Sequence, residues 1–223
     1  GALATGSNGF VSYPSDPIRV GLVGAGTNTR LRHIPGLQAI EGVEIVSVCN
    51  RSVSSAKRVA DEFGIPGIHD DWCTLVASDD IDAVVIGTWP YMHCPITLAA
   101  LSAGKHVMCE ARMAMDLAEA RQMLDASRQR PELVAQVVPS PFTLGVDRTI
   151  RRLFDHGTLG DILAIDLRAN GNAFLAPETR MSWRQDRAMS GLNTLMMGIW
   201  YEALMRWVGE AKSLMASGRV YVA

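Results

Sequence analysis

The chain has 223 residues, of which 48% are apolar and 20% are charged. This composition is typical of a globular protein and excludes a disordered one. The formal net charge of −2 gives no electrostatic reason to expect a nucleic acid or an anionic membrane surface as partner. No apolar run reaches the roughly 18 residues that a membrane-spanning helix needs.

Four cysteines lie far apart in the sequence and none forms a CxxC pair. This usage is typical of reduced thiols, so we expect a cytoplasmic protein. Residues 1–16 are rich in Gly, Ser and Pro and lack the basic and then apolar pattern of a secretory signal. They are predicted to form a flexible leader.

Strands and helices are expected to alternate from Ile18 to Val138, because apolar β-branched runs alternate with capped or amphipathic stretches. Apolar strands separated by helices predict a parallel sheet that is covered on both faces. Residues 17–139 are therefore predicted to form a Rossmann-type doubly wound α/β domain. The expected strands are 18–26, 43–50, 81–88, 106–110 and 133–138, and the expected helices are 29–40, 52–64, 70–78, 94–104 and 115–130.

The pattern changes after Pro139. Residues 140–223 are predicted to be the start of an α+β domain that serves substrate binding or oligomerisation and whose sheet is incomplete, so we expect a fragment or a truncated product. The expected elements are helices at 140–157 and 193–209 and strands at 161–170 and 211–223.

A glycine-rich turn, GLVGAGTNTR, joins the first strand to the first helix. Gly24 and Gly26 match the first two glycines of G-x-G-x-x-G, where the first permits a tight turn and the second lets backbone approach a pyrophosphate. Thr27 and Asn28 open the helix, whose N-terminal N–H groups suit an anion. Thr29 stands at the third glycine position, so looser helix–strand packing is expected there. The turn predicts a dinucleotide-binding site.

The residues after the second strand bear on the choice of dinucleotide. An Asp or Glu at this place would hold the ribose hydroxyls of NAD, but the chain has Asn50 followed by Arg51. The Arg51 guanidinium suits the 2′-phosphate of NADP, and it equally suits stacking on adenine or exposure to solvent. Both NAD and NADP stay open, with a slight preference for NADP.

Several stretches of the first domain together resemble one family. They are VGLVGAG, HIPGL followed by VEIVSVCNRS, ADEFGIP, IDAVVIGT followed by His93 and Pro95, and AALSAGKHVMCE. From Pro17 to about Gly209 the chain resembles the glucose–fructose oxidoreductase, inositol dehydrogenase and rhizopine catabolism family, known as Gfo/Idh/MocA. The resemblance implies a Rossmann domain joined to an α+β domain, and NAD(P)-dependent chemistry on sugars, cyclitols and related compounds. It also implies a homo-oligomer formed through the sheet of the second domain.

The resemblance assigns roles at the ends of the third and fourth expected strands. It implies that the segment with Thr88, Trp89, Pro90 and His93 lies over the nicotinamide half of the cofactor. It implies that Glu110 lies near the nicotinamide ribose. The alternatives are core packing for Trp89 and a hydrogen-bonded structural role for His93.

The stretch CEARMAMD departs from the family pattern. The family usually has Glu-Lys-Pro here, and its lysine helps to bind the substrate and to polarise the reacting group. In this chain Glu110 is followed by Ala111, which cannot donate a proton. Arg112 is shifted by one residue, which reverses the side-chain direction on a regular strand. Arg112 remains a candidate for binding an anionic substrate.

A second departure lies in the helix expected at 193–209. When the family's pattern of Asp, Gly, His and Asp is aligned here, Met196 takes the first Asp position and Trp200 takes the His position. Ala203 takes the second Asp position. Neither Met nor Trp can act as the acid or base on a hydroxyl proton.

Other residues are candidates for the missing roles. His93 and Tyr201 are the candidates for acid–base catalysis. Asn193 and Trp200 are candidates for substrate contact, against the alternative of core packing on one helix face. Arg184, in a loop with other arginines, is a candidate for clamping a carboxylate, against the alternative of a solvated loop.

Three functions stay open on this basis. The first is an NAD(P)-dependent oxidoreductase that acts on a sugar-like or polyol substrate by hydride transfer. The second is a relative that binds the cofactor without net redox turnover, as a lyase, an epimerase or a sensor, and the replaced Lys, Asp and His favour it. The third is a non-catalytic fragment. A small-molecule substrate is the expected partner in the first two, and no metal site is expected.

Overall fold

The computed structural model describes residues 16–171, 176, 178–192 and 194–219. Two compact units make up the chain, and each is described here by itself. The first unit contains the described residues up to Val138 together with a returning segment, Asp186–Leu192. The second unit contains the described residues of Pro139–Gln185 and those after Leu192. The return of a late segment to the first unit was not expected from the sequence.

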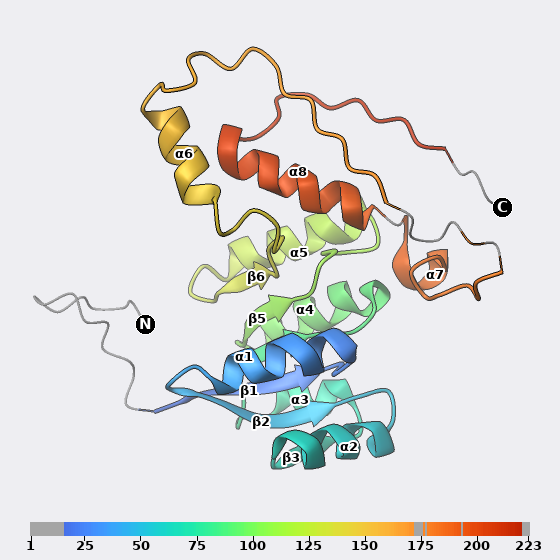
Figure 1. Ribbon diagram of the computed structural model, residues 1–223. Coiled ribbons are helices and arrows are strands. Elements are labelled where there is room, and N and C mark those ends of the chain that lie inside the picture. Colours follow the sequence, from blue (N-terminus) through green and yellow to red (C-terminus); the bar gives the residue numbers. More distant parts are fainter. Residues whose placement is uncertain (1–15, 172–175, 177, 193, 220–223) are drawn as a thin grey trace, which may run out of the picture. The chain divides into compact units, whose positions relative to one another are not determined.

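Six parallel strands form one sheet in the first unit, in the order β3-β2-β1-β4-β5-β6 (Figure 1). The direction of winding reverses between β1 and β4, which defines a doubly wound sheet and confirms the predicted Rossmann-type fold. The three-residue strand β3 was not predicted, because so short an edge strand shows no periodicity. The strands are β1 (Ile18–Val23), β2 (Val43–Cys49), β3 (Gly67–His69), β4 (Ala83–Ile86), β5 (His106–Cys109) and β6 (Ala135–Val137).

Helices cover both faces of this sheet. Along β4, Val84 and Ile86 join a buried cluster with residues of α3, α4 and α5, whereas Val85 joins a cluster with residues of α1 and α2. Successive strand residues point to opposite faces, so a strand that is buried on both faces has a continuously apolar sequence. The helices of this unit are α1 (Ile34–Gln38), α2 (Val53–Phe63), α3 (Trp72–Ala77), α4 (His93–Ser102), α5 (Leu117–Gln129) and α7 (Arg187–Ser190).

Two short helical turns lie after β1 and β4. A π-helical turn, η1 (Thr29–His33), leads into α1, so the helix expected at 29–40 consists of two parts. A 3₁₀ turn, η2 (Pro90–Met92), leads into α4. Both turns follow strands that meet at the reversal point of the sheet.

The second unit contains α6 (Asp147–Asp155) and α8 (Leu195–Val208). Asp147 joins these two helices, because its carboxylate accepts hydrogen bonds from Arg206 Nε at 2.8 Å and from Trp207 Nε1 at 2.7 Å. The strands expected at 161–170 and 211–223 are absent from the described residues, where the backbone is irregular. A strand needs a partner for its backbone N–H and C=O groups, and none of the described second-unit residues provides one.

We predict that the buried face of β1 dominates the stability of the first unit. Leu22 is 0% exposed and Leu31 is 68% exposed. Leu22→Ala should lower the free energy of unfolding by about 2–5 kcal/mol, because it leaves a cavity. Leu31→Ala, the matched control, should change it by less than about 0.5 kcal/mol. Denaturant unfolding measures both values, and equal losses would contradict the assigned core.

Candidate functional site

The turn after β1 and the turn after β4 touch at the reversal point of the sheet. Gly24 has φ 87°, and a Cβ at this residue would stand 2.6 Å from the backbone N of Thr88. Only glycine satisfies both conditions, the left-handed backbone and the close approach. Gly26, two residues on, has no heavy atom within 4 Å of a Cβ position. The turn therefore presents open backbone, which is the arrangement expected for contact with a pyrophosphate.

The third position of the glycine motif is packed tightly rather than loosely. Thr29 is 2% exposed, and its hydroxyl donates to the carbonyl of Gly24 at 3.1 Å. A Cβ on Gly87 would stand 2.2 Å from Thr29 Oγ1. The expectation of looser packing was wrong, because the missing side chain on Gly87 makes the room that a third glycine normally makes.

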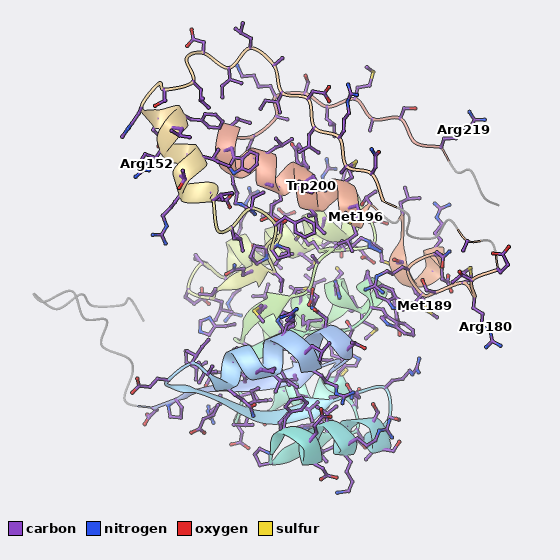
Figure 2. The ribbon with its side chains drawn as sticks, viewed as in Figure 1. Arg152, Arg180, Met189, Met196, Trp200 and Arg219 are labelled. Atoms are coloured by element: carbon purple, nitrogen blue, oxygen red, sulfur yellow. The ribbon has the colours of Figure 1, made fainter. Side chains whose placement is uncertain are left out.

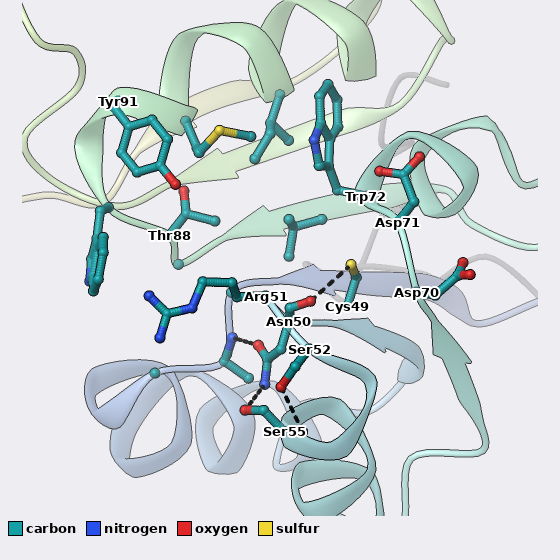
Figure 3. Close-up of a pocket in the computed structure, with 18 of the residues that line it drawn as sticks. Cys49, Asn50, Arg51, Ser52, Ser55, Asp70, Asp71, Trp72, Thr88 and Tyr91 are labelled. Carbon is teal, nitrogen blue, oxygen red and sulfur yellow. Dashed lines mark hydrogen bonds between the residues drawn. The ribbon is translucent and has the colours of Figure 1, made fainter. Parts of the chain in front are cut away.

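Asn50 braces the glycine turn. Its Oδ1 accepts a hydrogen bond from the N–H of Ala25 at 2.7 Å, and its Nδ2 donates to Ser55 Oγ at 3.1 Å (Figure 3). The amide uses one acceptor and one donor at once, which a carboxylate cannot do. Asn50 thus joins the ends of β1 and β2 to the first turn of α2.

A pocket of about 530 Å³ opens at these strand ends. This volume lies in the range of small-molecule and cofactor sites. Six of the predicted cofactor-binding residues line it, and five others, Thr27, Asn28, Pro90, His93 and Glu110, are not part of the lining. The six are Gly24, Gly26, Asn50, Arg51, Thr88 and Trp89.

Charged groups gather in the pocket near the end of β2. Arg51 and Arg58 line it, and so do Asp70 and Asp71. Figure 3 shows Arg51 and the two aspartates. Burial, with these two aspartates nearby, raises the pKa of the Cys49 thiol to about 11. The thiol therefore stays protonated at neutral pH and is not a nucleophile. Thr88 Oγ1 is buried and has no hydrogen-bond partner among the described residues.

Glu110 is held by donors from two sides. Its Oε1 lies 2.5 Å from His33 Nε2 and accepts from the Asn28 amide, and its Oε2 accepts from the N–H of Ala111 at 3.1 Å. Burial raises the pKa of Glu110, and the hydrogen bonds from His33, Asn28 and Ala111 lower it. Their effect is the larger one, so the pKa lies below its ordinary value and the carboxyl stays ionised at neutral pH. The cluster ties the end of β5 to the first helix after the glycine turn.

His33 is a site residue that the sequence analysis missed. It lies in the HIPGL motif, but its partner is 77 positions away in the chain. The side chains of His33 and Glu110 are only 13% and 17% exposed. Local spacing carries no signal for such a pair, which only the packing of η1 against the end of β5 creates.

His93 is buried and bridges two backbone segments through its ring nitrogens. It is 1% exposed, and its Nδ1 and Nε2 lie 2.8 Å from the carbonyl oxygen of Arg112 and 3.1 Å from that of Thr88. Burial lowers the pKa of His93 although both carbonyls favour its charged form. Neither nitrogen faces the pocket, so the geometry supports the structural alternative and argues against acid–base catalysis by His93.

Arg112 fastens the returning segment to the first unit. Its Nε donates to the carbonyl of Ser190 at 3.2 Å, and its Nη2 donates to the Ser190 hydroxyl, which is buried. Gly191 has φ 61°, and a Cβ there would stand 2.2 Å from the carbonyl oxygen of Met115. The guanidinium is engaged within the protein, which argues against the predicted role of Arg112 in binding an anionic substrate.

The remaining predicted residues belong to the second unit. Trp200 packs against Phe142 with ring centroids 5.3 Å apart, and Met196 on the same helix α8 is 54% exposed (Figure 2). Tyr201 is 37% exposed. Arg184 stacks on its neighbour Trp183 at 4.3 Å from the ring centroid. Asn193 lies outside the described residues.

The first domain matches the family described as "Oxidoreductase family, NAD-binding Rossmann fold", GFO_IDH_MocA, over residues 18–137. The chain belongs to the Gfo/Idh/MocA family. The match confirms the predicted family and the prediction of NAD or NADP as cofactor. The residues fit such a dinucleotide, because Gly26 is open and the Thr88 hydroxyl is unpartnered among the described residues.

Individual relatives are dehydrogenases and reductases. The chain is 32% identical to D-glucoside 3-dehydrogenase of Escherichia coli (strain K12), over 70% of this chain and 44% of that protein. It is 34% identical to 1,5-anhydro-D-fructose reductase of Ensifer adhaerens, over 78% of this chain and 50% of that protein. The chain thus spans about half the length of the curated relatives it matches.

A solved structure shows the same fold around a cofactor. It is a 3-ketoreductase from Actinomadura kijaniata in complex with NADP and TDP-benzene, 28% identical with a TM-score of 0.58, over 64% of this chain and 43% of that chain. Within the residues of this chain that the structure describes, no helix is long and apolar enough to cross a membrane. No group of three or more His, Cys, Asp or Glu side chains in the same residues is arranged to hold a metal ion.

We predict that the Glu110 cluster stabilises the first unit in a pH-dependent way. The folded-state pKa of Glu110 lies below its ordinary value of 4.5, so its stabilising effect is complete above that value and is lost as the pH falls through the folded-state pKa. Glu110→Gln should lower the free energy of unfolding by about 1–3 kcal/mol at neutral pH. Denaturant unfolding of both proteins at several pH values measures the difference, which should shrink on acidification. A difference that does not change with pH would contradict the assigned ionised carboxylate.

Proposed function

We propose that the protein is an NAD(P)-dependent oxidoreductase that transfers hydride to or from a sugar-like or polyol substrate. The observation that carries this proposal is the open glycine turn at the β1–β4 reversal, braced by Asn50 and bordered by an unpartnered Thr88 hydroxyl. Ligands of doubly wound sheets bind at this reversal. The names of its relatives, which include dehydrogenases and reductases of sugar-like compounds, support turnover over cofactor binding alone.

In this proposal, the glycine turn and Glu110 of the first unit both contact the dinucleotide. When bound, the nicotinamide ring donates or accepts the hydride. The backbone of Gly24–Gly26 and the start of the following helix bind the pyrophosphate, since N–H groups and the helix dipole favour an anion there. Glu110 keeps one lone pair on Oε2 for a ribose hydroxyl while His33 and Asn28 hold its other oxygen.

The acid–base group of the proposed reaction cannot be the one that the family usually has. Ala111 stands at the lysine position and has no polar side-chain atom. His93 is enclosed by two backbone carbonyls. Tyr201 is the remaining candidate, because its hydroxyl can both donate and accept a hydrogen bond. Arg184 and Trp200, together with Asn193, stay as proposed substrate contacts in the second unit.

Within this function, the pocket favours NADP over NAD. NAD-specific sites place an acidic side chain after β2, and its charge would repel a 2′-phosphate. Here that position is the neutral Asn50, which is already occupied in bracing the glycine turn. Arg51 and Arg58 both line the pocket beside it and can pair with a phosphate.

We predict that Arg51 contributes more to NADP binding than to NAD binding. Arg51→Ala should weaken NADP binding by roughly 10- to 100-fold, the range for a hydrogen-bonded charge pair, and should change NAD binding by less than about threefold. Calorimetric titration of both dinucleotides measures this. Lys57→Ala is the matched control, because Lys57 is an exposed cation on α2 outside the pocket. Equal losses for both dinucleotides would contradict the NADP preference.

The proposed activity is tested with nicotinamide absorbance and a panel of sugars, cyclitols and sugar acids. We expect the full-length protein to reduce NADP steadily with at least one polyol. Ala111→Lys, run in parallel, shows whether a lysine restores turnover, and Tyr201→Phe should lower kcat with little change in cofactor affinity. Silence of the wild type and of Ala111→Lys, together with tight cofactor binding, would contradict the redox function.

Two further properties belong to this proposal. We propose a cytoplasmic location, which is supported by the four cysteines being unpaired in the structure. We also propose a homo-oligomer through the second domain, as the family resemblance implies.

A further inference from the structure

The side chains of Arg51 and Trp89 lie close together in the pocket. The guanidinium carbon of Arg51 lies 5.4 Å from the centroid of the Trp89 ring, within cation–π range. Arg51 follows β2 and Trp89 follows β4, and these are the two strands that flank β1 with its glycine turn. Both residues line the same pocket. The guanidinium therefore lies over an aromatic ring.

The charged side chains that line the pocket determine how a phosphate group is bound there. Formal charges in the pocket balance, because Arg51 and Arg58 are offset by Asp70 and Asp71. In Figure 3 the Arg51 side chain and the two aspartates lie on opposite sides of the pocket. A phosphate near the end of β2 therefore gains little from the net charge, and it depends on direct pairing with a cation.

We propose that Trp89 is a specificity-determining residue that holds Arg51 by a cation–π contact and thereby lowers the advantage that a phosphomonoester on the adenosine ribose gives to NADP over NAD. This inference rests on the proposed dinucleotide function and adds a role for Trp89 that binding alone does not require. In it, NAD leaves the stacked pair intact, whereas NADP draws the guanidinium from the ring to its 2′-phosphate.

The magnitudes of the competing contacts favour this outcome. A cation–π contact at an exposed site is worth about two- to fivefold in an equilibrium constant. A charge-assisted bond to a phosphate is worth roughly 10- to 100-fold, so the phosphate wins the guanidinium. A neutral hydrogen bond to a ribose hydroxyl is worth about two- to tenfold, which is close to the stacking contact. Because the phosphate must displace the ring from Arg51 and NAD leaves the contact in place, the ring lowers the gain from the 2′-phosphate by about two- to fivefold.

The first test needs no cofactor. A double-mutant cycle with Arg51→Ala and Trp89→Leu measures the contact through thermal unfolding of the free protein. The summed losses in Tm of the single variants should exceed the loss in the double variant, because each single change removes the same contact. Strict additivity would overturn the proposal.

The second test measures selectivity by titration with NADP, NAD, 2′,5′-ADP and ADP. In Trp89→Leu the ratio of affinities for the 2′-phosphorylated ligand over its partner should rise about two- to fivefold, because Arg51 is no longer held back. Trp89→Phe should give a smaller rise, since it keeps an aromatic face. The rise should vanish in the Arg51→Ala background. Trp72→Leu is the matched control, because Trp72 lines the same pocket.

The outcomes separate this inference from the proposed function. Binding of NADP and NAD by the wild type with an unchanged or lower ratio in Trp89→Leu overturns the role of Trp89 and leaves the proposed function standing. Failure of the wild type to bind any of the four ligands overturns both. A rise of the ratio in Trp72→Leu that equals the rise in Trp89→Leu also overturns the inference, because the effect would then not depend on the stacked ring.

Discussion

The site depends on one backbone contact, the close approach of Gly24 to Thr88. Parallel pairing of β1 with β4 brings the two following turns together, and the lack of a side chain on Gly24 lets them touch. A bulkier residue would clash with the backbone of Thr88 and push the two turns apart. Gly87, the residue before Thr88, has a similar effect because it makes room for Thr29. This contact fixes the position of the glycine turn against Thr88, and both turns line the pocket.

The stretch CEARMAMD includes the end of β5 and has Ala111 at the position where the family resemblance implies a lysine. Glu110 still ends a cofactor-domain strand and is fixed by three donors. Ala111 contributes only its backbone N–H. The Arg112 guanidinium instead clamps Ser190, while its carbonyl is held by His93. The segment therefore holds the late returning piece of the chain against the first unit.

Asn50 shows how one neutral residue can change the electrostatics of its neighbours. Its amide accepts from the N–H of Ala25 and donates to Ser55 Oγ, so it joins the two elements without placing a negative charge at this position. The absence of that acidic charge leaves the two pocket arginines opposed only by Asp70 and Asp71. One amide thus braces the glycine turn and also leaves the end of β2 without an acidic charge.

The sequence by itself determined the Rossmann-type sheet, the glycine turn and the family, because each is encoded by local signals: apolar runs, capped helices and glycine spacing. Only the tertiary structure decided which side chains meet. It paired His33 with Glu110, enclosed His93, turned Arg112 to Ser190 and placed Arg51 on Trp89. It also shows no strand at 161–170. These outcomes depend on residues far apart in the chain, and a strand without a partner cannot satisfy its backbone groups.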